Sequence, residues 1–192
     1  ISPDGTIITR VVGNGGAGIP AVPATPATDA LLWPRGLAFD GARLYVATGY
    51  GAIYAVDPLG GDYAAGTLTL VAGVPATAGQ QDGPAATATF PTSSSAQLAT
   101  DGTGGVYVAG SGQSEVRRID TVGGTVSTPF GSTTGRAIDG AAAASMMNRP
   151  TGIAFGVRGG EPMLVFADTF NNRIRAFRLG DAQVVTLSGT GP

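Results

Sequence analysis

The chain has 192 residues, a formal net charge of −2, 11 basic residues that are all Arg, and neither Cys nor His. These absences exclude disulfide bonds, thiol nucleophiles, Schiff-base lysines, ordinary zinc sites and imidazole acid–base catalysis within this chain. The 32 Gly and 13 Pro are typical of low-complexity segments, yet 43% of the residues are hydrophobic and only 12% are charged, which favours a folded chain.

Glycines that close an apolar run recur roughly every 60 residues, which indicates an internal repeat. These glycines are Gly13, Gly73, Gly131 and Gly189. Two further anchors lie between them in a constant order. They are Leu37–Asp40, Leu98–Asp101 and Ile153–Gly156, then Tyr45–Ala47, Tyr107–Ala109 and Val165–Ala167.

The anchors divide the chain into one partial unit and three complete units. Residues 1–13 hold a single strand-like run, Thr6–Val12. The units at 32–73, 90–131 and 147–189 each hold four runs of about 4–6 residues, rich in Val, Ile, Leu, Tyr and Phe. We expect the second strands of these units at 44–47, 106–109 and 164–167. The segments that connect the units are 14–31, 74–89 and 132–146.

Turn dipeptides separate the runs within a unit. Asp40-Gly41 and Asp101-Gly102 lie between first and second runs, and Gly123-Gly124 lies between the last two runs of the second complete unit. No helical period of useful length is present. Short antiparallel strands repeated four at a time predict an all-β fold, a β-propeller of four-stranded antiparallel blades joined by inter-blade loops.

The last unit carries a more specific motif. Its segments Met147–Phe155 (MNRPTGIAF) and Phe166–Arg175 (FADTFNNRIR) resemble the NHL repeat. The linkers Gly13–Gly18 and Gln81–Thr87 are similar to those of bacterial, teneurin-like NHL arrays. The resemblance extends over essentially the whole chain, and it implies a propeller of about six blades.

Three complete units do not close a propeller, which typically has four to eight blades. The run at Thr6–Val12 lacks inner strands of its own, so we predict that it is the outer strand of a preceding blade. We therefore expect a single partial propeller domain over 1–192, about half of a six-bladed ring. The remaining blades would come from the same polypeptide, with a ring closed by a second copy as the alternative.

One face of such a propeller is the expected binding face, because long loops on a rigid scaffold commonly carry function. The inter-blade loops and the turns between second and third strands fall on this face. Its candidate binding residues are Trp33, Arg35, Tyr50, Gln113, Arg149, Phe170 and Asn171. Structural roles are the alternative: Trp33 could cap a blade core, and Asn171 could satisfy its own turn backbone.

The carboxylates do not predict a metal or catalytic site. Asp82-Gly83 and Asp139-Gly140 could offer oxygens to calcium, but each brings one carboxylate and calcium takes six to eight oxygens, so we interpret them as turns. A catalytic carboxylate pair needs two acids in one cleft, whereas the acids here lie one to a turn. We predict no cofactor, no transition-metal site and no catalytic residue in this chain.

These patterns favour a non-enzymatic binding or scaffold module of a larger bacterial protein, extracellular or periplasmic, with a protein or a glycan as partner. One alternative is half of a propeller enzyme, a lyase or hydrolase whose His or metal ligands lie outside this chain. RNA binding through Arg173, Arg175 and Arg178 is a minor alternative. We interpret those three as a solvated outer strand face, and the net charge of −2 predicts no nucleic-acid partner. No apolar run approaches the roughly 20 residues that span a bilayer, so we expect no membrane insertion.

Overall fold

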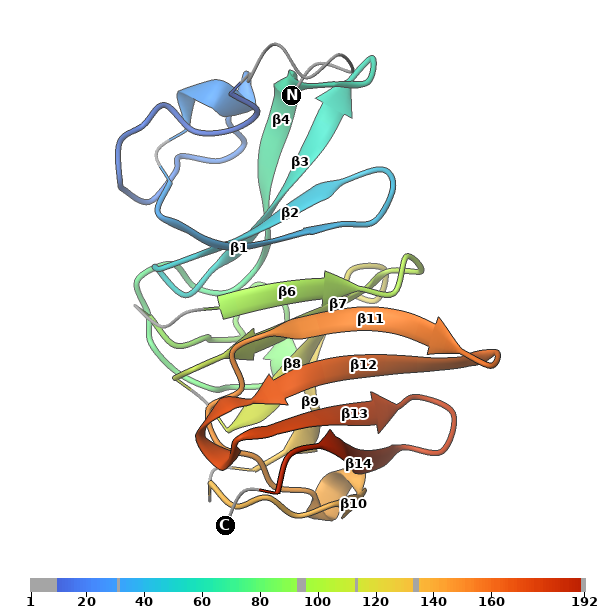
Figure 1. Ribbon diagram of the computed structural model, residues 1–192. Coiled ribbons are helices and arrows are strands. Elements are labelled where there is room, and N and C mark those ends of the chain that lie inside the picture. Colours follow the sequence, from blue (N-terminus) through green and yellow to red (C-terminus); the bar gives the residue numbers. More distant parts are fainter. Residues whose placement is uncertain (1–9, 31, 93–95, 113, 133–134, 191–192) are drawn as a thin grey trace.

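The computed structural model of the chain describes residues 10–30, 32–92, 96–112, 114–132 and 135–190. The described residues form three antiparallel β-sheets, which follow one another along the chain (Figure 1). Helical structure is limited there to three short 3-10 turns. The predicted all-β fold class is confirmed.

The first sheet contains β1 (Pro34–Phe39), β2 (Leu44–Thr48), β3 (Ile53–Leu59) and β4 (Asp62–Ala72), paired in chain order. Four consecutive residues are buried in each of its two central strands. These strands are covered on both faces, which explains why they read as short continuous apolar runs in the sequence.

The second sheet repeats this order with β6 (Ala96–Thr100), β7 (Gly105–Gly110), β8 (Glu115–Asp120) and β9 (Thr125–Gly131). A fifth strand of two residues, β5 (Gly83–Pro84), pairs with the outer edge of β9. It comes from the segment that connects the first two sheets.

The third sheet contains β11 (Ile153–Arg158), β12 (Glu161–Asp168), β13 (Arg173–Arg178) and β14 (Gln183–Ser188). Its own fifth strand, β10 (Gly140–Ala141), pairs with β14 in the same manner. The strands predicted at 44–47, 106–109 and 164–167 are confirmed, because they lie within β2, β7 and β12.

The connecting segments are more structured than predicted. We expected 74–89 and 132–146 to be loops, yet they contribute β5 and β10 to the sheets. The segment 14–31 forms an isolated bridge between Ala24 and Leu68 of β4. The three 3-10 turns are η1 (Ala27–Asp29), η2 (Ala142–Ala144) and η3 (Thr169–Asn171). Strands of two residues are too short to leave a periodic signal in the sequence, so the prediction missed them.

The strand predicted at Thr6–Val12 lies mostly outside the described residues, which begin at Arg10. The described part, Arg10 to Val12, is in no strand. Val12 packs instead against the buried cluster that covers the far side of the first sheet. That cluster includes Ala27, Leu32, Tyr54, Val56 and Leu68.

The turns predicted at Asp40-Gly41 and Asp101-Gly102 form between the first two strands of the first and second sheets, and in both the Asp side chain accepts a backbone N–H of the turn. The carboxylate of Asp40 accepts the backbone N–H of Ala42 at 2.8 Å and the hydroxyl of Tyr45 at 3.0 Å. Asp101 repeats this arrangement, with the hydroxyl of Tyr107 donating at 3.3 Å. These carboxylates therefore fix both the turn and a tyrosine of the following strand.

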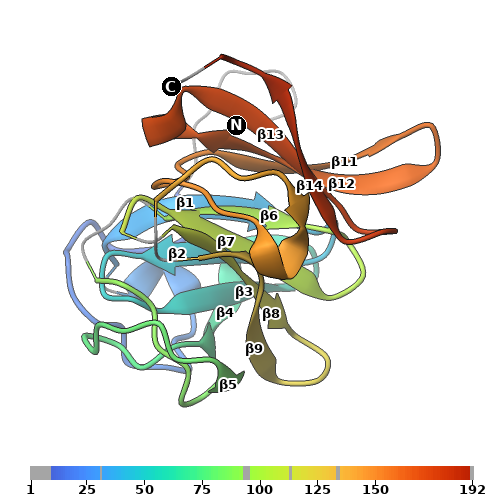
Figure 2. The ribbon, with the colours of Figure 1, turned by 90° about the horizontal axis from the view of Figure 1, so that it is seen from below.

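The first strands of the three sheets, β1, β6 and β11, lie next to one another (Figures 1 and 2). The hairpins β1–β2, β6–β7 and β11–β12 all point to the right edge of Figure 1, whereas β1, β6 and β11 begin toward the left edge, where much of the first two connecting segments lies. The third connecting segment, with β10 and η2, runs along the lower end of the view. The described residues do not form a closed ring. The arrangement is thus an arc of three sheets with two different edges.

Two apolar cores join neighbouring sheets. The first, between the first and second sheets, includes Tyr45, Ile53, Leu98, Val108 and Ile119. The second, between the second and third sheets, includes Tyr107, Phe130, Leu164, Phe166 and Phe177. The rings of Phe130 and Phe177 are stacked with centroids 4.3 Å apart. Burial of each such side chain contributes roughly 1.5–3 kcal/mol, so these cores hold the arc together.

Candidate ligand-binding face

A cluster of two aromatic rings and one guanidinium lies where the chain enters β1. The rings of Trp33 and Tyr50 meet edge to face with centroids 5.6 Å apart. The guanidinium carbon of Arg35 lies over the Trp33 ring, 4.2 Å from its centroid. Trp33 remains 38% exposed, so the sequence-predicted residues Trp33, Arg35 and Tyr50 form one solvent-accessible group.

Gly49 allows this cluster to form. Its backbone N–H donates to the carbonyl of Trp33 at 2.8 Å, which brings the indole against the glycine. A Cβ at position 49 would lie 2.6 Å from the indole ring, closer than any real contact. The orientation of Trp33 therefore depends on the missing side chain at Gly49.

A second cluster lies at the entrance to β11. The guanidinium carbon of Arg149 is 4.9 Å from the centroid of the Phe170 ring, which is 58% exposed. The backbone N–H of Phe170 donates to the carbonyl of Asn148 at 3.2 Å and ties the η3 turn to the entering segment. Two further predicted residues, Arg149 and Phe170, are thus brought together.

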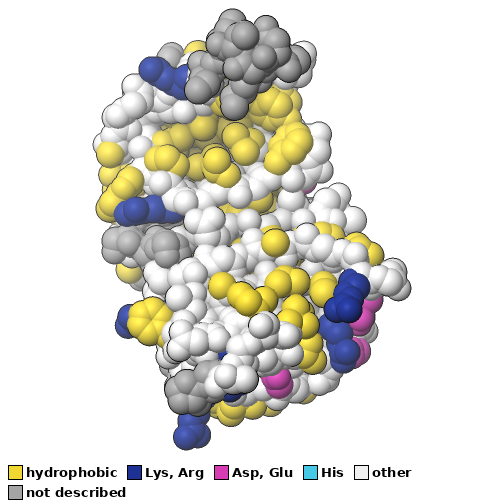
Figure 3. Space-filling model, viewed as in Figure 1, with side chains coloured by type: hydrophobic (Ala, Val, Ile, Leu, Met, Phe, Trp, Pro, Cys, Tyr) yellow, Lys and Arg dark blue, Asp and Glu magenta, His cyan; other side chains and the backbone are white. Residues whose placement is uncertain are grey.

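The two clusters occupy equivalent places in the first and third sheets. Trp33 and Arg149 each directly precede a proline, and Tyr50 and Phe170 each lie two residues after the end of the second strand. The second sheet has Gly112 at the corresponding position. Figure 3 shows Arg side chains beside hydrophobic side chains along the left edge, the edge toward which β1, β6 and β11 begin in Figure 1. The candidate ligand-binding face is defined by these two clusters.

The other predicted residues do not join either cluster. Gln113 lies outside the described residues. Asn171 is only 8% exposed, and its amide donates to both carboxylate oxygens of Asp168, at 3.0 and 2.9 Å. Its side chain therefore belongs to an internal network. The structural alternative named the turn backbone as its partner, whereas the amide donates to the side chain of Asp168.

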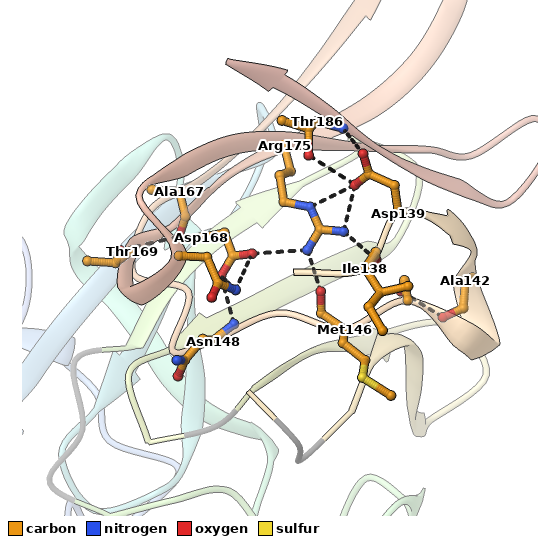
Figure 4. A network of polar contacts seen from close by, with 12 residues as sticks. Ile138, Asp139, Ala142, Met146, Asn148, Ala167, Asp168, Thr169, Arg175 and Thr186 are labelled. Carbon is orange, nitrogen blue, oxygen red and sulfur yellow. Dashed lines mark hydrogen bonds and ion pairs between the residues drawn. The ribbon is translucent and has the colours of Figure 1, made fainter. Parts of the chain in front are cut away.

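That internal network centres on Arg175, whose side chain is fully buried (Figure 4). Its Nε and Nη2 donate to the same oxygen of Asp139, at 3.1 and 2.8 Å, and its Nη1 donates to Asp168 at 3.0 Å. The carbonyls of Ile138 and Met146 accept the remaining two N–H groups. All five donors of the guanidinium are satisfied, as burial of this group requires.

Arg117 holds the same position in the second sheet and is also fully buried. Its Nε donates to Asp82 at 2.9 Å, and its terminal nitrogens donate to the carbonyls of Thr89 and Gln81 at 3.1 and 2.8 Å. Asp82 in turn accepts the backbone N–H of Thr128 in β9 at 2.9 Å. Each arginine thus links a connecting segment to the third and fourth main strands of its sheet.

These contacts correct the interpretation of Arg173, Arg175 and Arg178 as one solvated basic face. Arg175 points into the protein, whereas Arg178 is partly exposed and forms an ion pair with Asp181. The sequence did contain a signal for the buried arginines. An Asp-Gly dipeptide precedes Arg117 by 35 residues and precedes Arg175 by 36.

The two Asp-Gly carboxylates are therefore engaged by arginines. Burial acts to raise the pKa of Asp139, but hydrogen bonds from Thr186 and Arg175, together with the charge of Arg175, hold that pKa below its ordinary value. In the part of the chain that the structure describes, no three His, Cys, Asp or Glu side chains are grouped to hold a metal ion. No helix among the same residues is long and apolar enough to cross a membrane.

No protein-family model and no curated protein sequence matches the chain. Solved structures do resemble it. An auxiliary nutrient binding protein from Bacteroides ovatus superimposes with a TM-score of 0.58 at 16% identity, over 81% of this chain and 36% of that one. A protein of that description from Bacteroides thetaiotaomicron superimposes with a TM-score of 0.58 at 16% identity, over 80% of this chain and 35% of that one. A protein of unknown function from Bacteroides thetaiotaomicron superimposes with a TM-score of 0.60 at 18% identity, over 81% of this chain and 36% of that one. At such identities the likeness concerns the fold, and the chain spans about a third of these proteins' length.

Proposed function

We propose that this chain is a non-enzymatic binding module, a β-propeller segment that holds a protein or glycan ligand on the face defined above. The observation that carries the proposal is the pair of exposed aromatic–guanidinium clusters at equivalent positions of the first and third sheets. Exposed aromatic rings give flat apolar surface with little conformational freedom to lose on binding. A guanidinium beside the ring adds a fork of donors for a carboxylate or carbonyl group.

The propeller assignment rests on the repeat itself. Three antiparallel sheets, each with four main strands and with their first strands side by side, support an interpretation as consecutive blades around an axis. The resemblance to NHL repeats supports the same interpretation.

The structural neighbours also support a binding role, since two of them are described as auxiliary nutrient binding proteins. A module of that kind would act outside the cytoplasm, where nutrients and surface glycans are first met. We therefore propose a periplasmic or extracellular location.

The single tryptophan of the chain offers a direct test, because Trp33 lies in the first cluster and its emission reports on that cluster alone. Purified chain is titrated with soluble neutral and acidic polysaccharides while Trp33 fluorescence is followed. We expect saturable binding that Tyr50→Ala and Phe170→Ala each weaken about 5–30-fold, the loss typical of a contact residue worth 1–2 kcal/mol.

Arg178→Ala is the matched control, because Arg178 lies beside the β13–β14 hairpin on the opposite edge of the arc. It should leave the affinity unchanged. Equal affinities in all variants would reject the proposed face. If no glycan changes the emission, a photo-crosslinker on a Phe170→Cys chain, which has no other Cys, tests for a protein ligand instead.

A further inference from the structure

The guanidinium groups of the two clusters have no acceptor for their N–H groups. Neither Arg35 nor Arg149 forms an ion pair or a side-chain hydrogen bond within the part of the chain that the structure describes, and the Nε of Arg35 is buried there without a partner. Arg117 and Arg175, by contrast, are bonded to carboxylates inside the protein. A carboxylate is the acceptor whose two oxygens match the fork of a guanidinium.

Many of the carboxylates lie at the opposite edge of the arc. Those in or next to the turns between first and second or third and fourth main strands are Asp40, Asp62, Asp101, Asp120, Glu161 and Asp181. Beside the turns between second and third main strands, Glu115 and Asp168 are only 8% and 0% exposed, and buried arginines engage Asp82 and Asp139. In Figure 3 the Arg side chains at the right edge lie next to carboxylates, whereas those along the left edge have none beside them. The clusters therefore present positive charge, although the whole chain carries −2.

The backbone at Arg149 has an unusual conformation. Its φ is 48°, in the left-handed region that residues other than glycine seldom adopt. In this conformation the exposed guanidinium lies over the ring of Phe170. Backbone strain of this kind is concentrated at functional positions, where the surrounding structure maintains it.

The second sheet has an open pocket in place of a cluster. Gly112 stands where Tyr50 and Phe170 stand in the other sheets. The pocket beside it has a volume of about 550 Å³ and is lined by Ala78, Gly79, Gln80, Pro91, Thr92 and Gly112. No charged side chain lines it, and the amide of Gln80 and the hydroxyl of Thr92 can bond hydroxyl groups. Because the second sheet packs between the first and the third, this pocket lies between the two clusters.

We propose that the ligand is a polyuronate, a polysaccharide whose sugars carry carboxylates, and that it lies across the three sheets with one carboxylate on Arg35 and another on Arg149. This inference rests on the proposed binding function. The rings of Trp33 and Phe170 pack against the C–H faces of two sugars, and the guanidinium beside each ring donates to a carboxylate. The pocket at Gly112 takes an intervening sugar.

The ligand has to be a chain in order to reach both clusters. Packed sheets lie about 10 Å apart, so a single sugar acid would contact one cluster only. An acidic protein is a poorer occupant, because a protein interface centres on large side chains buried in well-packed pockets. The pocket at Gly112 is lined by small and polar side chains, and Trp33 and Phe170 stand exposed on either side of it.

The test compares polyuronates with matched neutral polymers. Alginate, polygalacturonate and hyaluronate are each titrated into the purified chain by isothermal calorimetry, beside the same polymers with methyl-esterified carboxyl groups. We expect at least one polyuronate to bind and its ester to bind about tenfold or more weakly, because the ester forms no charge-assisted hydrogen bond to a guanidinium. The uronic acid monomer should bind at least about 100-fold more weakly than the polymer, since it engages one cluster alone.

Two arginine variants make the result specific. Arg158, at the end of β11 on the opposite edge, is exposed like Arg149 and likewise forms no ion pair with a described residue. We expect Arg149→Gln to weaken polyuronate binding about tenfold and to leave the affinity for the ester unchanged. Arg158→Gln should change neither affinity. Equal weakening of both ligands by Arg149→Gln would indicate a merely structural role and contradict the assignment.

Three further results would overturn the proposal. They are failure of all three polyuronates to bind, equal affinity for a polyuronate and its ester, and equal affinity for poly-glutamate, which would identify an acidic protein as the occupant. Binding of a neutral polymer that Tyr50→Ala weakens would reject the carboxylate but leave the proposed binding function in place. The binding function and the ligand class can therefore fail separately.

Discussion

Arg175 donates two hydrogen bonds to one oxygen of Asp139, a residue that lies 36 positions earlier in the chain. The other oxygen of Asp139 accepts the backbone N–H of Thr186 in β14 at 2.8 Å. One carboxylate thus connects a buried guanidinium, an outer strand and the segment between two sheets. Arg117 and Asp82 repeat the connection in the second sheet.

We expect Arg175→Met to lower the free energy of unfolding by about 3–5 kcal/mol, because it leaves the fully buried carboxylate of Asp168 without its cation. Urea denaturation followed by circular dichroism measures this loss. Arg178→Met is the control: its ion pairs are partly exposed, so the loss should stay under about 1 kcal/mol. Equal losses of unfolding free energy in the two variants would show that the burial of Arg175 does not account for its contribution to stability.

Asp139 should make the protein sensitive to acid. Because the folded state holds the pKa of Asp139 below its ordinary value of 3.8, its ionisation stabilises the fold above that pH. This stabilisation is lost as the pH falls through the lower, folded-state pKa. Asp139→Asn should therefore be less stable than the unsubstituted chain at pH 7, with the difference shrinking toward pH 2. Urea titrations at several pH values test this, and a difference independent of pH would contradict it.

Ionisation of Glu115 should have the opposite effect on the stability of the fold. Burial raises its pKa, and the nearby charge of Asp82 adds to this against the attraction of Arg117. A raised carboxyl pKa favours folding at pH values below the ordinary pKa, and this contribution is lost as the pH rises through the folded-state value. We expect Glu115→Gln to be more stable than the unsubstituted chain at pH 7 and equal to it near pH 3. Thermal unfolding at both pH values distinguishes this from a simple loss of contacts, which would destabilise at pH 7.

Tyr54 occupies the position that Arg117 and Arg175 have in the other sheets. Its hydroxyl is buried with no hydrogen-bond partner among the described residues, and burial raises its pKa to about 12. Tyr54→Phe should therefore be neutral or stabilising by up to about 1 kcal/mol, because it removes an unsatisfied polar group.

The matched variant for that experiment is Tyr45→Phe. It removes the 3.0 Å hydrogen bond to Asp40 and should cost about 0.5–1.5 kcal/mol. In urea denaturation, Tyr45→Phe should therefore have a lower free energy of unfolding than Tyr54→Phe, by at least about 0.5–1.5 kcal/mol. A clear destabilisation by Tyr54→Phe would mean that its hydroxyl has a partner.

Much of the fold could be predicted because its signals are local. The runs at 44–47, 106–109 and 164–167 combine apolar side chains with turn residues a few positions away, and they form β2, β7 and β12. The two-residue strands β5 and β10 carry no such signal. The burial of Arg117 and Arg175 also ran against expectation, since arginine is seldom fully buried unless it is paired.

The candidate site, like the fold, could be predicted from the sequence only in part. The residue types and the loops they occupy were predicted from the repeat, including Trp33 and Phe170. Their contacts were not, because the edge-to-face pairing with Tyr50 and the guanidinium over each ring depend on how the segments before β1 and β11 meet the following turns.

By itself the sequence determined the all-β class and the positions of the main strands, because short apolar runs and turn dipeptides act over a few residues. The repeat could be read from glycines that recur about every 60 residues along the chain. Only the tertiary structure decided that Asp139 meets Arg175, that Asn171 turns inward to Asp168, and that Ile174 stays open while Ile53 is covered. These outcomes depend on the packing of whole sheets. Packing joins residues far apart in the chain, and it differs between positions whose local sequences are nearly alike.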